Sequence, residues 1–144
     1  MLHTKAIGTV GELMVAAELV SLGYAVFTEL GDLSPIDLIT VKDSKLTRIQ
    51  VKTQKSTSRG TISVPRKSKG PGYEYSYSST DIDVVAVYAM DRKEVFYVSI
   101  EELSTKTTGL TLRIDPPTNG QVIGVNLAEN YRSFENAQCG PIAQ

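Results

Sequence analysis

The sequence predicts an α/β fold in which a mixed β-sheet is flanked by helices. Two observations carry this prediction. A long helical pattern of apolar residues stands near the N-terminus, and most of the following chain alternates short apolar runs with turn residues. A second helical pattern follows the last strand, and the order helix, strands, helix is typical of an α/β domain. No repeat or linker interrupts the sequence, so we expect one domain over residues 1–144.

Residues 8–23 form the first predicted helix. Apolar side chains recur in it at intervals of three and four residues, and Gly23 offers a C-terminal cap. Its acidic residue Glu18 is expected at the surface. Five apolar positions define the predicted core face of this helix, namely Val10, Leu13, Met14, Ala17 and Val20.

The strands are predicted from apolar runs that polar turn residues separate. They cover residues 24–30, 36–43, 46–54, 61–67, 81–90, 94–100 and 109–114. Residues 68–79 are predicted as a loop because they contain Gly-Pro-Gly and several serines. A short helix is expected at 100–104 and a terminal helix at 126–137.

The composition excludes several classes of protein. The hydrophobic content of 41% and the charged content of 22% are ordinary for a globular domain. One cysteine, Cys139, and one histidine, His3, exclude an intrachain disulfide and a Cys/His metal site within one chain, and we expect no chemistry from either. No apolar run has the length of a membrane span, and the N-terminus lacks a signal-peptide pattern. We therefore expect a cytoplasmic protein that does not associate with a membrane.

Basic residues are concentrated in one part of the chain. The net charge is −1, but residues 42–69 hold nine lysines and arginines against one acid, Asp43, which makes this segment +8 and the remainder −9. An asymmetry of this size predicts a face that binds a polyanion. The alternative is a solvated strand pair whose lysines protect a sheet edge.

Polar residues interrupt two of the predicted strands. Asp37 lies in an apolar run, and Gln50 and Lys52 flank Val51 in the next. Because side chains alternate along a strand, Gln50 and Lys52 share one face. The short turn around Ser44 makes the two strands a hairpin, and counting outward from it places Asp37 near Gln50. Gln54 lies on the same face and is expected in solvent.

This hairpin predicts a metal site. Glu12 of the preceding helix can reach Asp37 and Gln50 if that helix packs on the sheet. Two carboxylates and an amide oxygen are hard ligands, which Mg²⁺ prefers. A lysine beside such a metal suits phosphoryl chemistry, because it can position a water and neutralise charge on the phosphorane.

These segments resemble the PD-(D/E)XK nuclease superfamily. "GELMVAAELVSLGY", "IDLITV" and "IQVKTQ" match its helix with an acid, its Asp strand and its acid-x-Lys strand. They are similar to archaeal Holliday-junction resolvases and more similar to the small homing endonucleases encoded in bacterial group I introns. "DIDVVAVYAMDRKEVFYVSIEEL", "LRIDPPTNGQ" and "AENYRSFE" also resemble the intron-type group, so the similarity covers most of the chain.

The sequence departs from the superfamily pattern at two places. Ile36 separates Pro35 from Asp37, and Gln50 stands where the superfamily usually has an acid. The amide keeps a carbonyl oxygen but removes one negative charge, so metal should be held more weakly. The intron-type nucleases carry Gln at this position, which favours that subgroup.

The resemblance implies a restriction-endonuclease-like core and a metal-dependent endonuclease that hydrolyses phosphodiester bonds at specific sites in double-stranded DNA. It assigns metal binding to Glu12, Asp37 and Gln50, catalytic assistance to Lys52, and the cofactor role to Mg²⁺, with Mn²⁺ as a substitute. It also implies a homo-oligomer, either a dimer or a tetramer. The residues expected to contact DNA are Lys55, Arg59, Arg66, Lys67, Lys69, Tyr73 and Tyr75.

Two alternatives to a homing-type endonuclease remain. A Holliday-junction resolvase or other structure-specific nuclease would use the same residues on branched DNA. A DNA-binding module that keeps the fold without catalysis would bind and not cleave.

Overall fold

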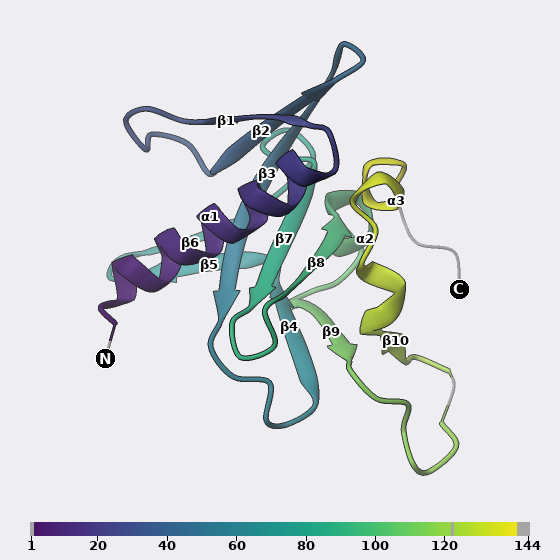
Figure 1. The fold of residues 1–144 in the computed structure, drawn as a ribbon. Coiled ribbons are helices and arrows are strands. Elements are labelled where there is room, and N and C mark those ends of the chain that lie inside the picture. Colours follow the sequence, from purple (N-terminus) through teal and green to yellow (C-terminus); the bar gives the residue numbers. More distant parts are fainter. Residues whose placement is uncertain (1, 122, 141–144) are drawn as a thin grey trace.

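A five-stranded mixed sheet forms the centre of the structure, in the order β1-β2-β3-β7-β8 (Figure 1). The computed structural model describes residues 2–121 and 123–140, and of Lys69 and Gly70 it describes the backbone alone. Neighbouring strands are antiparallel except for β3 and β7, which are parallel. The strands are β1 (Ala25–Thr28), β2 (Leu38–Lys42), β3 (Lys45–Gln54), β7 (Val84–Ala89) and β8 (Glu94–Ser99).

A two-residue turn sets the register of the β2–β3 hairpin. Asp43 and Ser44 both have positive φ angles, 51° and 65°, which suit the right-handed twist of the two strands. Lys42 therefore pairs with Lys45, and Leu38 pairs with Ile49. This register brings the start of β2 to the middle of β3, as the sequence predicts.

Helix α1 (Thr4–Ser21) begins four residues earlier than predicted, because the His3 side chain caps it by accepting a hydrogen bond from the Lys5 N–H. It covers one face of the sheet (Figure 1). The predicted core face was wrong: the buried residues of α1 are Gly11, Val15 and Leu19.

A glycine explains this rotation of α1. A Cβ atom at position 11 would collide with the side chain of Thr53 on β3, so only glycine lets the helix approach the sheet there. The apolar pattern alone did not reveal this, because glycine contributes no apolar side chain. Of the five residues predicted to face the core, Val10 is partly buried against it, whereas the other four face solvent, with Leu13 64% exposed and Val20 58% exposed.

A second, smaller sheet covers the opposite face of β7 and β8. It has the order β10-β9-β4, and a core that includes Ile62, Val64, Leu110 and Leu112 fills the space between the sheets. The separate core beneath α1 and α3 is built around Val15, Leu19, Ile49, Val51, Tyr97 and Phe134. The remaining elements of this part are β4 (Thr61–Pro65), α2 (Ile100–Ser104), β9 (Gly109–Arg113) and β10 (Asn126–Leu127).

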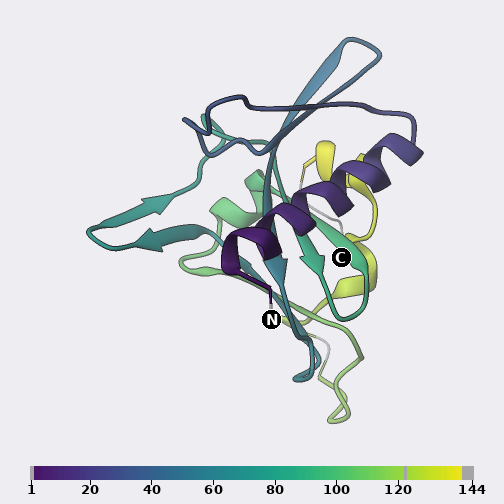
Figure 2. The ribbon, with the colours of Figure 1, turned by 60° about the vertical axis from the view of Figure 1, so that its left-hand side comes forward.

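The segment predicted as a loop, 68–79, contains most of a β-hairpin. Strands β5 (Lys67–Gly70) and β6 (Tyr73–Ser76) pair antiparallel and extend away from the rest of the chain (Figure 2). Gly72, with φ 77°, makes the turn, and alternating tyrosines favour the strand. We call residues 66–77 the arm.

The predicted terminal helix over 126–137 is also divided. Asn126 and Leu127 pair with β9, a 3-10 turn follows at Ala128–Tyr131, and α3 spans Phe134–Gln138. The Ser133 side chain accepts a hydrogen bond from the Asn136 N–H and so begins a separate helix.

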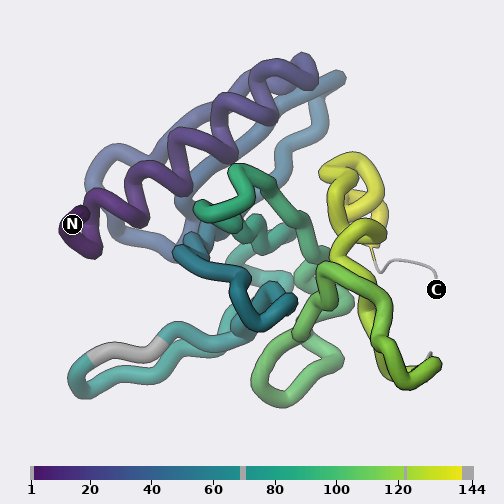
Figure 3. The backbone as a smooth tube through the Cα atoms, turned by 60° about the horizontal axis from the view of Figure 1, so that its bottom comes forward, coloured from purple at the N-terminus to yellow at the C-terminus, as the bar shows by residue number. Residues whose placement is uncertain are grey.

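The arm and α3 lie on opposite sides of the structure (Figure 3). No helix among the described residues is both long and apolar enough to cross a bilayer.

Candidate active site

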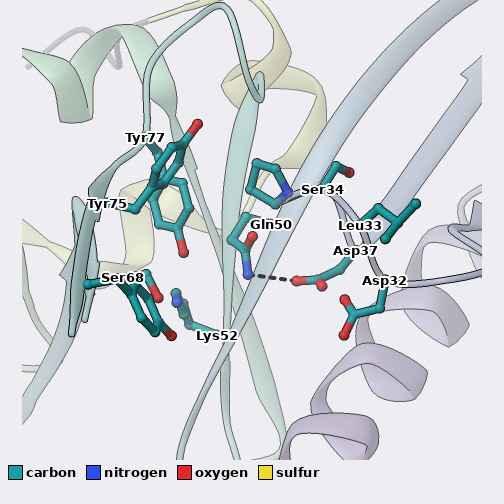
Figure 4. A pocket seen from close by; sticks show the side chains of 11 residues that line it. Asp32, Leu33, Ser34, Asp37, Gln50, Lys52, Ser68, Tyr75 and Tyr77 are labelled. Atoms are coloured by element: carbon teal, nitrogen blue, oxygen red, sulfur yellow. Dashed lines mark hydrogen bonds between the residues drawn. The ribbon is translucent and has the colours of Figure 1, made fainter. Parts of the chain in front are cut away.

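An open cavity of about 570 Å³ lies between the middle of β3, the loop before β2 and the arm (Figure 4). Strand β3 contributes Gln50 and Lys52 to its wall. The loop contributes Asp37 and four residues that precede it, Asp32, Leu33, Ser34 and Pro35. The arm contributes Ser68, Tyr73, Tyr75 and Tyr77. Three segments that are separate in sequence thus meet at the residues that the sequence singled out.

Asp37 is fixed against β3 by three hydrogen bonds. Its N–H donates to the Ile49 carbonyl over 2.9 Å. Its Oδ2 accepts from the Val51 N–H at 2.7 Å and from the Gln50 Nε2 at 2.8 Å (Figure 4). The two residues that the hairpin count placed side by side are therefore in direct contact, and the carboxylate has one well-defined position.

Gln50 and Lys52 face the cavity, while Val51 between them belongs to the core beneath α1. The Lys52 Nζ lies 5.3 Å from the centre of the Tyr77 ring, a cation–π distance. Tyr77 itself is buried, so it is a fixed wall for the ammonium group. Lys52 is thereby held in the cavity that contains Asp37.

Glu12 reaches the same place from α1. Burial, then the charge of Asp37 and a hydrogen bond with it, raise the pKa of Glu12 to about 7. Burial also raises the pKa of Asp37, and the Val51 N–H, Glu12 and Lys52 oppose that rise. The site is thus a pair of interacting carboxyl groups whose negative charge is incompletely balanced.

Asp32 is a third carboxylate that the sequence analysis missed. It lines the cavity, and its charge contributes to the raised pKa of both Glu12 and Asp37. Its backbone has a positive φ of 52°, and it follows Gly31, which also has a positive φ. The "GD" pair before the Asp37 strand is a turn signal, and it could have suggested that the loop folds back toward the site.

The residues expected to contact DNA are in different situations. Tyr73 and Tyr75 line the cavity, and Tyr73 is 58% exposed. Lys55 and Arg59 are exposed in the connection between β3 and β4. Lys67 forms an ion pair across the arm with Glu74, at 2.8 Å.

Of the two further expected DNA contacts, Arg66 does not line the cavity, and the side chain of Lys69 is not described. The Arg66 guanidinium donates to the Lys106 carbonyl at 2.8 Å and is therefore directed at the segment after α2. Lys69 pairs within the arm through its backbone, and its side chain lies outside the described part of the chain.

Part of the basic segment has structural contacts. Arg48 forms an ion pair with Asp83 at 2.9 Å, and Lys42 lies 4.7 Å from the Tyr24 ring centre at the far end of the β2–β3 hairpin. The segment therefore extends along the length of β3 and continues into the arm, so its charge is not gathered at one point.

Two side chains that the sequence analysis placed in solvent have internal partners. The Gln54 Nε2 donates to the Thr61 carbonyl, and its Oε1 accepts from the Ser63 N–H, so Gln54 joins β3 to β4. Glu18 accepts a hydrogen bond from the Tyr97 hydroxyl. Polar side chains on a predicted exposed face can thus be internal connectors, which periodicity alone does not reveal.

Comparisons with known proteins identify the family and agree with the fold. The family described as PD-(D/E)XK endonuclease matches residues 2–134. Protein 5.3 of Escherichia phage T7 is 28% identical over 101 residues, which cover 70% of this chain and 84% of that protein. The structure of a bacterial homing endonuclease, I-Ssp6803I, superposes with a TM-score of 0.70 at 18% identity, over 91% of this chain and 89% of that chain. The predicted fold class, a mixed sheet flanked by helices, is confirmed.

Proposed function

The chain belongs to the PD-(D/E)XK endonuclease family, and on that premise we propose that it is a magnesium-dependent, site-specific endonuclease of homing type that hydrolyses phosphodiester bonds in double-stranded DNA. The proposal takes residues 1–144 as one nuclease domain. The observation that carries it is the direct contact of Asp37 with Gln50 in an open cavity that Lys52 also lines, with Glu12 interacting with Asp37 from α1.

The residues present fit a divalent cation. Burial raises the pKa of both Glu12 and Asp37, and the charge of Asp37 raises that of Glu12 further; a bound cation would stabilise the charged form of both groups. Among the described residues, no three side chains from Asp, Glu, His and Cys are grouped as a metal site, so the amide oxygen of Gln50 is needed as a ligand. Turning the Gln50 amide about its last side-chain bond would exchange its NH₂ for that oxygen beside Asp37.

Each side chain would then have a distinct task. A divalent cation held by Glu12, Asp37 and Gln50 would activate water and neutralise phosphate charge. The Val51 N–H holds the Asp37 carboxylate in place, so the position of the ligand does not depend on the substrate. Lys52 brings a positive charge to the reacting phosphate and stabilises the charge that develops on it. Tyr73 and Tyr75, on the opposite wall, contact the sugar–phosphate backbone.

The DNA surface in this proposal continues from the cavity to neighbouring basic residues. Lys55 and Arg59 are exposed next to β3, and Lys67 and Lys69 lie in the arm. We assign Arg66 no phosphate contact of its own, because its guanidinium bonds the Lys106 carbonyl. The protein acts in the cytoplasm as a homo-oligomer, since cutting both strands of a duplex needs two sites.

A second candidate is a catalytically inactive DNA-binding module. The specific observation in its favour is that Gln50 donates its amide N–H to Asp37, a contact that a metal-binding acid would not make. Binding without cleavage would support this candidate.

Cleavage assays test the proposal. The protein is incubated with plasmid and a random-sequence duplex library in Mg²⁺, Mn²⁺ or EDTA, and a synthetic four-way junction is included to detect a structure-specific nuclease. We expect metal-dependent duplex cleavage that Lys52→Ala abolishes, with duplex affinity kept within several-fold. Lys45→Ala, at the other end of β3, is the matched control and should cleave normally. Full cleavage by Lys52→Ala would remove the catalytic assignment.

A further inference from the structure

Lys52 is close to the carboxylates of the site but is not paired with them. Its charge opposes the rise in the pKa of Asp37, so the two groups interact electrostatically. The Val51 N–H, which neighbours Lys52 in the chain, binds the Asp37 carboxylate at 2.7 Å, so that carboxylate lies within reach of a lysine side chain at position 52. Nevertheless, among the described residues no carboxylate forms an ion pair with Lys52. A different contact therefore fixes the direction of this side chain.

The ring of Tyr77 provides that contact. The Lys52 Nζ lies over the ring, 5.3 Å from its centre, where the negative face of an aromatic ring attracts a cation. The ring is held in place, because Tyr77 is 3% exposed and packs in the core between the two sheets. The Tyr75 ring also meets it edge to face, with the two centres 5.6 Å apart.

The backbone fixes Tyr77 at the base of the arm. Its N–H donates to the Arg66 carbonyl at 3.0 Å, which closes the arm at its root. The Arg66 N–H donates in turn to the Thr108 carbonyl at 3.2 Å, and the Arg66 guanidinium donates to the Lys106 carbonyl at 2.8 Å. The ring is thus attached to the main body of the protein, although the outer part of the arm extends away from it (Figure 2).

We propose that Tyr77 is a positioning residue, whose ring holds the Lys52 ammonium group away from Asp37. Asp37 is then free to bind a cation, and Lys52 is free to meet a phosphate. This inference rests on the proposed function and adds a buried residue that binds neither metal nor DNA. Without the ring, we expect Lys52 to pair with Asp37, because opposite charges at close range in a partly buried site attract strongly.

Proton NMR of the free protein, without DNA or metal, tests the geometry. The ring current above an aromatic face shifts nearby protons upfield, so the ε-methylene protons of Lys52 should lie upfield of those of Lys45, which is exposed at the other end of β3. Lys42, 4.7 Å from the Tyr24 ring centre, is an internal reference for such a shift. Tyr77→Phe keeps the ring and should keep the shift, whereas Tyr77→Leu should remove it. Wild-type Lys52 protons at the position of the Lys45 protons would overturn the proposal, even if Tyr77→Leu did not fold.

Calorimetric titration with Mg²⁺ tests the consequence for the site. Tyr77→Leu should weaken Mg²⁺ binding by about tenfold, because the released ammonium group competes for Asp37, and Tyr77→Phe should bind as the wild type does. Removing the competing cation should restore binding, so Tyr77→Leu combined with Lys52→Met should bind Mg²⁺ as tightly as Lys52→Met alone. A general defect in packing at Tyr77 would not be rescued in this way. An affinity that stays low in the double variant would therefore overturn the proposal.

Phe96→Leu is the matched control. Phe96 is 2% exposed in the same core, and Arg132 lies over its ring at 5.5 Å, but neither residue lines the cavity. This variant should lose similar packing and leave the Lys52 signals and the Mg²⁺ affinity unchanged. An equal loss of affinity in Phe96→Leu would assign the effect to the core and overturn the positioning role. A protein that shows the upfield Lys52 signals but neither binds Mg²⁺ nor cuts DNA would reject the proposed function alone.

Discussion

Asp37 and Asp83 occupy corresponding places on the two sides of β3. Each stands just before a neighbouring strand and donates its backbone N–H to a β3 carbonyl at 2.9 Å, Asp37 to Ile49 and Asp83 to Arg48. Each also accepts a β3 N–H on its Oδ2, from Val51 at 2.7 Å and from Arg48 at 2.8 Å. The backbone thus fixes both carboxylates in the same way.

The two carboxylates differ in what balances their charge. Burial alone would raise the pKa of Asp83, but hydrogen bonds from the Arg48 side chain and backbone hold it below its ordinary value. Burial raises the pKa of Asp37 and the charge of Asp32 adds to that rise, although the Val51 N–H, Glu12 and Lys52 oppose it. A fixed arginine makes Asp83 a structural residue, whereas the unbalanced charge at Asp37 leaves it able to bind a cation.

Replacing each aspartate by asparagine separates the two roles most sharply. Asp37→Asn should lower cleavage by at least about 10²-fold, because a metal ligand supports several kcal/mol of transition-state stabilisation. Asp83→Asn should cleave normally per folded molecule but lose about 1–2 kcal/mol of stability, as charged hydrogen bonds of a half-exposed pair are lost. Cleavage rates and thermal unfolding of both variants measure this contrast. The assignment of the two roles would be wrong if Asp83→Asn abolished cleavage and Asp37→Asn did not.

Replacing Gln50 by an acid would increase the difference in charge between the surroundings of Asp37 and those of Asp83. Gln50→Glu places a further carboxylate in contact with Asp37 and removes the amide N–H that now binds it. We expect Mg²⁺ affinity to rise by roughly tenfold, about 1.4 kcal/mol, and the metal-free protein to melt at a lower temperature. Calorimetric titration with Mg²⁺ gives the affinity. An unchanged affinity would show that position 50 is not a ligand.

The smallest expected effect is on how the free energy of unfolding depends on pH. The pKa of Glu12 rises from 4.5 to about 7 on folding, so the folded state favours its protonated form. The stability of the metal-free protein should therefore be greatest below about pH 4.5 with respect to this group, and should fall as the pH rises through about 7. Unfolding curves in EDTA should show this decline, and Glu12→Gln should flatten it. A steeper decline in the variant would contradict the assignment.

The contact between Asp37 and Gln50 could be predicted because it depends on local rules. A two-residue turn fixes the register of the hairpin, and side-chain alternation then assigns the faces of Gln50 and Lys52. Asp32 could not be located in the same way, since its position follows from the path of an irregular loop. The partner of Arg48 is likewise distant in sequence: Asp83, just before β7, is 35 residues away, and no local pattern specifies the contact.

The errors in the predicted fold have a common cause, which is that tertiary contacts decided the structure at those places. The face that α1 buries is decided by Gly11 against Thr53, although the apolar count favoured Leu13 and Val20. Residues 68–77 of the arm were predicted as part of a loop because Gly-Pro-Gly and serines dominate the sequence there, yet cross-strand pairing makes them most of a hairpin. In both cases the residues carry weak local preferences, and the neighbouring segment determines the outcome.

The closeness of Gly11 to β3 also bears on how far the site tolerates change. Glu12 is the next residue, so the distance at which α1 rests on the sheet sets how far its carboxyl group reaches toward Asp37. A single methyl group at position 11 would have to push the helix outward or displace Thr53. The alignment of the site is therefore governed by the absence of one carbon atom on the opposite side of β3 from Gln50 and Lys52, where the helix backbone comes close to Thr53.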